Sequence, residues 1–538
     1  MLKRILVAGV VMCMMAGAVQ GQVWQPDLGN GKYKNPIIFA DYSDPDVARK
    51  GDDYYMVASS FNVAPGIPVL HSKDLVNWEL VGHVFEKQVP VEHFSTPQHG
   101  NGAWAPSITY HDGEFYVYWG DPDFGIYMAK TDDPAGEWED PVLVQEAKGW
   151  IDPAPLWDDD GNAYLVHAFA ASRSSRKSIL VMHRMSPDGT ELLDDGAIVF
   201  DGHESHPTIE GPKLYKKGEY YYIFAPGGGV PTGWQTILRS RDIFGPYEDK
   251  IVLHQGNTDI NGPHQGGYVE TPSGQPWFIH FQDREAYGRI VHLNPVRWED
   301  GWPMMGVDKN DDGIGEPVTE YETPESDFSD SKVVPQTSDE FNGVEPGLQW
   351  QWHSNPEPIW GWMRANKGYF RLYAVDKPEG YTNLWDIGSI FLQKIPAPAF
   401  TATTKVTFHT REDGDRTGLI MMGQDYAYVS LEQQDGNLVI AQRTCMGAND
   451  GKSEKTIETS EVSTNTVYLR VTVEQAQEFP PCTFSYSTDG ENFTQIGESF
   501  NARQGQWIGA KVGMFTTREI HYRDAAFADY DWFRVTSK

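Results

Sequence analysis

The sequence predicts an all-β protein in two parts, a five-bladed β-propeller followed by a β-sandwich. A polar opening, an apolar residue, a turn and an aromatic-rich strand recur five times between about residues 35 and 318. The spacing of these repeats, roughly 45 to 60 residues, is typical of one four-stranded propeller blade per repeat. A second series of alternating strands follows, and no amphipathic helix longer than a turn or two is visible in either part.

The residues that open the five repeats differ along the chain. The openings contain Asp44, Ala105, Asp152, Glu210 and His264, and hairpin-type turns such as His-Asp-Gly and Asp-Gly-Asn follow the opening strands. Because the first strand of a propeller blade lines the central channel, these residues are expected to converge near the axis. Three of the five are carboxylates. The repeat therefore predicts an acidic pocket at the axis.

The chain divides at a polar stretch. Residues 320–338 are rich in Pro, Ser and Thr, which is linker composition. Beyond them, alternating segments such as 400–408 and 467–473 are separated by Gly, Asp and Asn turns, a pattern typical of a β-sandwich. The expected organisation is a signal peptide at 1–21, a propeller at 22–325, a linker at 326–338 and a sandwich at 339–538.

The N-terminus has the pattern of a secretory signal. Lys3 and Arg4 precede an apolar run over residues 5–18, and small residues lead to a cleavage site before Gln22. The run is too short for a stable membrane span. We therefore expect an exported protein, periplasmic or extracellular, without membrane insertion. A lipoprotein attached through Cys13 is the alternative, although the residue before it is not the small one that such a site needs.

Composition narrows the class of ligand. The formal net charge of −33 argues against nucleic acid and against anionic membrane surfaces. Aromatic residues make up 13% of the chain, including 18 Trp, which suits β-sheets and also the flat platforms on which sugar rings stack. Cys445 and Cys482 are the cysteines that remain after processing, and they are expected either to pair or to stay as buried thiols.

Three carboxyl groups around one pocket suit the hydrolysis of a glycosidic bond. One must be protonated to assist the leaving oxygen, and one must be ionised to activate water. A third carboxylate nearby raises the pKa of the acid by like-charge repulsion. A single Asp-Pro is usually a turn or a helix cap. The inference therefore depends on three equivalent positions in one repeat.

The acidic segments also resemble a known family. The sequences DPD, WIDP and IEGP, which contain Asp44, Asp152 and Glu210, resemble the three signature blocks of glycoside hydrolase family 43. The resemblance covers nearly the whole chain without its signal. It implies an inverting mechanism on a five-bladed propeller, with Asp44 as general base, Asp152 as modulator of pKa and Glu210 as general acid.

Two further regions carry the resemblance. The segment from Phe61 to residue 78 looks like the β-xylosidase and α-L-arabinofuranosidase branch of the family. Residues 505–515 and 528–533 resemble the concanavalin A-like sandwich, a jelly roll, that follows the propeller in that branch. The likeness of the segment that begins at Phe61 indicates which sugars the protein acts on. The likeness of the two later segments indicates the fold of the C-terminal domain.

Other site residues follow from the same resemblance. It implies that His264 lies near a metal ion in the axial channel, often calcium held largely by water, and that no other cofactor is required. Arg289 matches an arginine that meets the substrate or the modulating carboxylate, while Phe61 and Trp104 are expected to wall the sugar pocket. Ordinary structural roles remain the alternatives: a hydrogen-bonded histidine, a salt-bridged arginine and core-packed rings.

A second metal pattern is weaker. Residues 308–313 spell the start of a calcium loop, D-x-N-x-D-G. Thr319 stands where the bidentate Glu belongs, and no helices are predicted on either side. An acidic turn is the better interpretation.

The sequence therefore predicts an exo-acting, inverting glycoside hydrolase. Its expected partner is an arabinose- or xylose-containing oligosaccharide or polysaccharide of the plant cell wall, from which it releases terminal α-L-arabinofuranosyl or β-D-xylosyl units. A retaining fructan hydrolase is one alternative, disfavoured by the WIDP and EGP blocks. A non-catalytic sugar-binding propeller or a sandwich-led lectin is another. Arabinofuranose and xylopyranose present similar hydroxyl edges, so both sugars stay open.

The sandwich is expected to dock on the propeller. The linker carries no long Gly/Ser or Pro/Thr run and offers little reach. Trp350, Trp352, Trp360 and Trp362 crowd the first part of the domain, so some of these rings are expected to pack against the propeller. An exposed sugar platform built from the same rings is the alternative.

Overall fold

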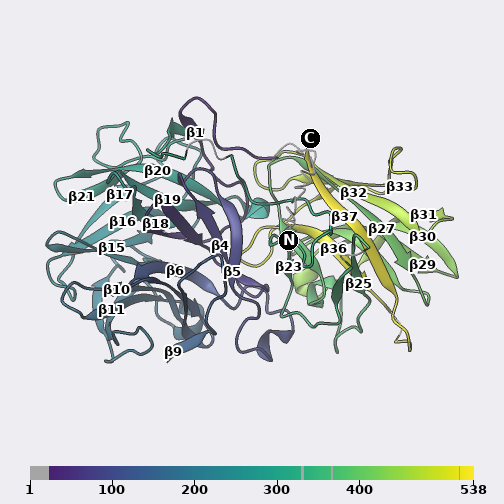
Figure 1. The fold of residues 1–538 in the computed structure, drawn as a ribbon, viewed down its shortest axis with the longest axis horizontal. Coiled ribbons are helices and arrows are strands. Elements are labelled where there is room, and N and C mark those ends of the chain that lie inside the picture. The colour runs from purple at the N-terminus through teal and green to yellow at the C-terminus, as the bar shows by residue number, and fades with distance from the viewer. Residues whose placement is uncertain (1–22, 329–331, 365–366, 520) are drawn as a thin grey trace, which may run out of the picture.

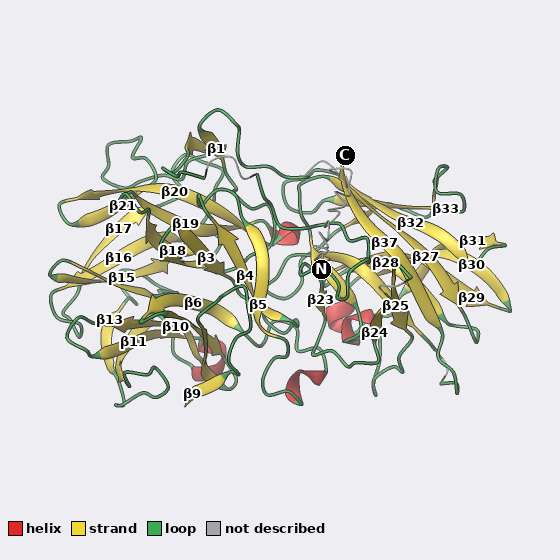
Figure 2. Cartoon of the chain, in the orientation of Figure 1, coloured by secondary structure: helices red, strands yellow, loops and turns green. Residues whose placement is uncertain are grey.

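The computed structural model describes residues 23–328, 332–364, 367–519 and 521–538. Two β-lobes lie side by side, with β1–β22 in one and β23–β37 in the other (Figure 1). Strands dominate both lobes, and the helices are single short turns (Figure 2). These turns are η1 (His93–Ser95), α1 (Ala171–Ser174), η2 (Glu285–Tyr287), η3 (Leu384–Asp386) and η4 (Ala448–Asp450).

The first lobe is a propeller of five blades, each an antiparallel four-stranded sheet whose strands follow chain order. Blade one contains β2 (Asp46–Lys50), β3 (Asp53–Val57), β4 (Gly66–Ser72) and β5 (Glu79–Phe85). Blade two contains β6 (Trp104–His111), β7 (Glu114–Asp121), β8 (Gly125–Thr131) and β9 (Val142–Glu146). Blade three contains β10 (Trp150–Trp157), β11 (Ala163–Phe169), β12 (Ile179–Met185) and β13 (Ala197–Asp201). Blade four contains β14 (Lys213–Lys217), β15 (Tyr220–Gly227), β16 (Trp234–Ser240) and β17 (Glu248–Leu253). Blade five contains β18 (His264–Glu270), β19 (Pro276–Asp283), β20 (Arg289–Glu299) and β21 (Trp302–Met305).

Hydrophobic patterning explains the blades. Their second strands are packed on both faces by neighbouring blades, so β7 and β11 read as nearly continuous buried runs rather than as alternating ones. The turn between β6 and β7 places Asp112 and Gly113 at φ of 46° and 93°, the left-handed geometry of a tight hairpin. Alternation between apolar and polar residues is therefore weak along the propeller strands, and the hairpin turns are the stronger sequence signal of this fold.

The ring closes where the last blade meets the first. Strands β1 (Lys32–Lys34) and β22 (Glu320–Glu322) pair with each other and join the two ends of the propeller. On the inner side, a Cβ placed on Gly267 of β18 would lie 2.6 Å from Oδ1 of Asp46 and 2.7 Å from the amide nitrogen of Val47. Only glycine allows blade five to approach blade one this closely.

The second lobe is a sandwich of two antiparallel sheets, as expected. One has the order β23 (Gln351–Trp352), β26 (Phe391–Lys394), β36 (Lys511–Thr517), β28 (Arg416–Met422), β29 (Tyr426–Gln434), β30 (Asn437–Cys445) and β31 (Lys455–Val462). The other has the order β24 (Gly361–Arg364), β25 (Tyr369–Tyr373), β37 (Phe527–Ser537), β27 (Phe400–His409), β32 (Thr466–Val473), β33 (Pro481–Ser487) and β34 (Thr494–Gln495), with β35 (Phe500–Asn501) also paired to β33. Strand β32 alternates strictly between buried and partly exposed residues, which is the pattern of a one-sided sheet.

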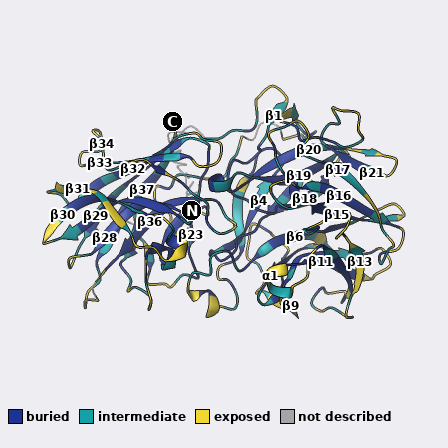
Figure 3. Cartoon of the chain, turned by 180° about the vertical axis from the view of Figure 1, so that it is seen from behind, coloured by how far each residue is buried: buried dark blue, intermediate teal, exposed yellow. Residues whose placement is uncertain are grey.

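The sandwich packs directly against the propeller. Ala64 and Trp352 exchange backbone hydrogen bonds of 3.2 and 2.6 Å, and the side-chain amide of Asn62 donates to the carbonyl of His353 at 2.7 Å. The apolar core of the sandwich also includes Phe39 and Tyr287 of the propeller. Buried residues run through the strands of both lobes, and exposed ones lie mainly in the outer loops (Figure 3).

The four tryptophans in the first part of the sandwich were expected either to pack against the propeller or to form an exposed sugar platform. Trp350 and Trp360 are buried inside the sandwich, and the backbone of Trp352 pairs with the propeller, whereas Trp362 is 52% exposed. They do not form one shared platform.

The remaining expectations from the sequence concern the two cysteines, the signal peptide and membrane insertion. Cys445 and Cys482 are both buried free thiols, so the pairing that the sequence left open does not occur. The expected signal peptide and Cys13 lie outside the described residues. Within the described ranges, no helix is long and apolar enough to cross a membrane.

Candidate active site

A shared kink in the backbone turns the blade openings toward the axis. Each opening contains a residue of positive φ: Asp44 (54°), Ala105 (37°), Asp152 (57°), Gly211 (58°) and Gln265 (36°). In blades two, three and five the strand register shifts at this point, so the kink acts as a bulge. Positive φ is unfavourable for a residue with a side chain and clusters at functional sites.

Asp44 is held on several sides. Its Oδ2 accepts hydrogen bonds from the hydroxyls of Ser43 (2.8 Å) and Ser59 (2.6 Å). Nη1 of Arg289 lies 3.1 Å from Oδ1 and 3.3 Å from Oδ2 of the same carboxylate. Asp44 and Arg289 are both buried. Three donor groups from Ser43, Ser59 and Arg289 therefore fix the position of this carboxylate.

Asp152 lies deeper and has fewer partners. Its Oδ2 accepts the backbone N–H of Gly211 at 2.7 Å. Burial raises the pKa of Asp152 to about 7, the negative charge of Asp44 adds to this rise, and the bond from Gly211 opposes it.

Glu210 is the most perturbed of the three acids. Burial raises its pKa to about 8, and the charges of Asp152 and Asp44 add to the rise while Arg289 opposes it. These surroundings therefore favour the protonated form of the Glu210 carboxyl group. These mutual effects place the three predicted carboxylates near one another and near Arg289.

His264 lies beside this pocket and is completely buried. Its Nε2 is 3.6 Å from Oε1 of Glu210, and burial together with Arg289 lowers the pKa of His264 to about 3. Among the described residues, neither ring nitrogen has a hydrogen-bond partner. The described ranges contain no group of three or more His, Cys, Asp or Glu side chains able to hold a metal ion. The neutral ring therefore fits only an ion whose other ligands are mainly water.

Aromatic rings from both domains contact one another at Trp104. Phe61 is buried with φ of 53°, and its ring centroid is 6.3 Å from that of Trp104. Trp104 is half-buried, donates from its indole to the carbonyl of Gly100 at 2.7 Å, and meets Trp507 at 6.4 Å. Trp507 belongs to a sandwich loop and is 51% exposed.

Sequence reasoning missed several of these residues. Ser43 precedes Asp44 and Ser59 follows β3, but nothing in the sequence links a serine to a distant carboxylate. Trp507 stands within the segment that resembles the family's sandwich, although that likeness does not say where the loop points. A cross-domain contact has no local sequence signal.

The loop at 308–313 has the hydrogen bonds of an acidic turn, which is the preferred interpretation of its sequence. The carboxylate of Asp308 accepts backbone N–H groups from Asn310, Asp311, Asp312 and Gly313 at 2.8 to 3.3 Å. These bonds are those of a tight acidic turn.

The sequence was compared with known families and proteins. Residues 33–303 match the model for glycosyl hydrolases family 43, and residues 338–536 match that for the β-xylosidase C-terminal concanavalin A-like domain. The chain belongs to glycosyl hydrolases family 43. This family 43 protein is 40% identical over 494 residues to a putative β-xylosidase of Xylanibacter ruminicola, covering 91% of this chain and 87% of the relative.

Other relatives differ in the sugar that they are named for. This family 43 protein is 29% identical to a non-reducing end α-L-arabinofuranosidase of Bacteroides ovatus, covering 94% of this chain and 95% of the relative. It also resembles the solved family 43 structure from the xyloglucan locus of Bacteroides ovatus, with a TM-score of 0.80 at 27% identity, covering 94% of this chain and all of that one (100%). The protein is a glycoside hydrolase, and family 43 enzymes are inverting exo-glycosidases. The family assignment therefore decides against the alternatives considered from the sequence, which were a retaining fructan hydrolase and a non-catalytic sugar-binding protein or lectin.

Proposed function

We propose that this enzyme releases terminal β-D-xylosyl or α-L-arabinofuranosyl units from oligosaccharides and polysaccharides of the plant cell wall, with Asp44 as general base, Glu210 as general acid and Asp152 as modulator. The observation that carries the proposal is the different surroundings of Asp44 and Glu210. Burial and like charges raise the pKa of Glu210 to about 8, while Arg289 and two serines bind the carboxylate of Asp44.

The reaction follows from these different surroundings. Ionised Asp44 takes a proton from a water molecule as the water attacks the anomeric carbon. Glu210 gives its proton to the glycosidic oxygen, which leaves on the opposite face, so the configuration inverts. Asp152 is buried beside Glu210, and its negative charge helps to keep Glu210 protonated until the bond breaks.

Arg289 and the rings are proposed to bind the sugar. The guanidinium holds Asp44 and also carries donors toward the pocket. Phe61, Trp104 and Trp507 offer ring faces that suit the C–H surface of a xylose or arabinose unit.

His264 is the residue that would hold a hydrated calcium ion in the channel, since its ring is neutral and its nitrogens have no partner among the described residues. Such an ion supplies positive charge beside the acids. Export by the N-terminal signal to the periplasm or the extracellular space is part of the same proposal, because polymeric substrates of this kind lie outside the cell.

The test compares aryl β-D-xylopyranoside and aryl α-L-arabinofuranoside as substrates of the purified enzyme, with the anomer of the released sugar followed by NMR. We expect turnover of one or both substrates, faster on the xyloside, and a product of inverted configuration. Retention of configuration, or failure to hydrolyse either substrate, would contradict the proposal.

A further inference from the structure

Asp41 lies where the active site meets the sandwich domain. The carboxylate is buried, and its two oxygens have different partners. Oδ1 accepts the backbone N–H of Arg289 at 2.9 Å, and Oδ2 accepts the backbone N–H of Gly509 at 3.0 Å. One side chain of the propeller therefore binds both the arginine of the site and a loop of the other domain.

The backbones around Asp41 are in close contact. A Cβ on Gly509 would lie 2.6 Å from the amide nitrogen of Gly288, and a Cβ on Gly288 would lie 2.5 Å from Cβ and Cγ of Asp41. The N–H of Ala510 donates to the carbonyl of Ala286 at 2.7 Å. The sandwich loop is therefore held against the segment that leads directly into Arg289.

Two sandwich lysines face the same carboxylate. Lys394 of β26 and Lys511 of β36 are direct partners across the sheet, an arrangement in which like charges repel. Burial and the charge of Lys394 lower the pKa of Lys511 to about 7, and Asp41 opposes this change. Asp41 also opposes the lowering of the pKa of Lys394. The propeller thus supplies a negative charge for a lysine pair in the sandwich.

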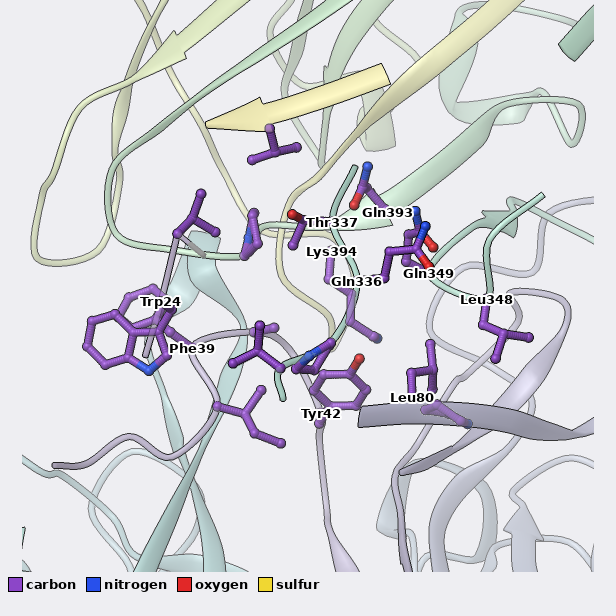
Figure 4. Close-up of a pocket in the computed structure, with 18 of the residues that line it drawn as sticks. Trp24, Phe39, Tyr42, Leu80, Gln336, Thr337, Leu348, Gln349, Gln393 and Lys394 are labelled. Carbon is purple, nitrogen blue, oxygen red and sulfur yellow. The ribbon is translucent and has the colours of Figure 1, made fainter. Parts of the chain in front are cut away.

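Lys394 also borders a cavity of about 290 Å³ at the domain junction. Its Nζ lies 5.0 Å from the centre of the Tyr42 ring, and Figure 4 shows both residues among the side chains that line the cavity. The N–H of Tyr42 in turn donates to the carbonyl of Arg289 at 3.1 Å. The peptide groups on both sides of Arg289 are therefore bound by the segment that contains Asp41.

We propose that Asp41 is a positioning residue through which the sandwich domain fixes Arg289, and with it Asp44, in the geometry that hydrolysis requires. The proposal rests on the role proposed above for Asp44. Asp41 acts on the backbone of Arg289, and Nη1 of Arg289 acts on Asp44. A shift of the sandwich loop is thus transmitted to the base by three consecutive contacts, from Gly509 to Asp41, from Asp41 to Arg289 and from Arg289 to Asp44.

The test is Asp41→Asn in the full-length enzyme. Asparagine has nearly the same shape but lacks the charge, and its NH₂ group would face one of the two N–H donors. We expect kcat to fall by about 10- to 100-fold, because displacing a catalytic group by about 1 Å lowers the rate by up to this factor. KM should stay within a few-fold. The loss should be equal for an aryl glycoside and a natural oligosaccharide, because both need the base.

The pH profile separates positioning from a purely structural role. Arg289 opposes the raised pKa of Glu210, so when Arg289 loosens, the basic limb of kcat/KM should move to higher pH. Asp415→Asn is the matched control, because Asp415 is also buried and its Oδ2 accepts two backbone N–H groups, from Arg411 (2.7 Å) and Glu412 (2.9 Å). This control should lower thermal stability and leave kcat and the pH profile unchanged.

A second substitution separates stability from catalysis. Adding Lys511→Met to Asp41→Asn removes one uncompensated lysine, so thermal stability should partly recover while kcat stays low. If Asp41→Asn does not fold, Gly509→Ala, which displaces the loop without changing charge, should give the same kinetic loss.

Wild-type kcat and an unchanged basic limb in a folded Asp41→Asn enzyme would overturn the positioning role, and so would a Gly509→Ala enzyme with wild-type kinetics. Retained activity in Asp44→Asn would instead overturn the proposed function.

Discussion

The two β-domains fill their interiors differently. The sandwich has a large apolar core, which takes in Phe39, Tyr287 and Ile290 of the propeller, and a second, smaller apolar cluster. The propeller has separate apolar clusters between its blades, and its axis holds buried charged groups such as Asp44, Asp152 and Arg289. Burying charges is costly unless they are paired. Apolar packing between the blades therefore stabilises the propeller, and the charged groups near its axis are available for catalysis.

The largest expected effect concerns the axis. Asp44→Asn removes the group that activates water, so kcat should fall by about 10²- to 10⁴-fold for every substrate, the usual worth of one acid–base group. The free energy of unfolding should also decrease, because the buried guanidinium of Arg289 loses a charged partner. Steady-state kinetics and urea unfolding measure the two quantities. A strong loss of stability with retained turnover would reverse the contrast drawn between axis and core.

Glu210→Gln should have an effect that depends on the leaving group. A natural oligosaccharide needs protonation of its leaving oxygen, so its turnover should fall by about 10²- to 10⁴-fold. An aryl glycoside with a good leaving group should lose much less. Parallel kinetics on both substrates test this, and equal losses would show that Glu210 is not the acid.

Removing the sandwich should damage the propeller. Residues 23–325 alone would expose Phe39, Tyr287 and Ile290 to water and would leave Asp41 without Gly509. We expect lower solubility, a lower midpoint of thermal unfolding and reduced kcat. A soluble, fully active propeller of unchanged stability would show that the sandwich is a separable module.

Phe484→Ala tests the other side of the comparison. Phe484 is fully buried in the sandwich core, and such a truncation costs about 3 to 5 kcal/mol of unfolding free energy. At a temperature where the variant is folded, kcat should equal that of the wild type. Urea unfolding with activity measured in parallel checks both, and a selective loss of kcat would mean that the sandwich core affects the site.

Asp152→Asn should give the smallest change, a shift in pH dependence. Activity of the wild type should fall as pH rises through about 8, where Glu210 loses its proton. Because the charge of Asp152 contributes to that raised pKa, its removal should lower the pKa of Glu210 and move the basic limb of kcat/KM to lower pH. An unmoved basic limb would count against the modulating role.

The sequence by itself determined the repeat, and with it the five blades, and it predicted that Asp44, Asp152 and Glu210 lie near one another. Periodic turns and openings are local signals, and propeller geometry converts a repeated position into a shared place. The alternating strands likewise predicted the sandwich, because one-sided burial leaves a period of two.

Only the tertiary structure decided what surrounds those acids. Ser59 reaches Asp44 across 15 positions of the chain, and Asp41 meets Gly509 across 468. The unpaired thiols, the exposed Trp362 and the placement of Trp507 beside Trp104 likewise depend on contacts between distant segments. A residue's type and its neighbours in sequence carry no record of such contacts, because they form only when separate sheets pack together.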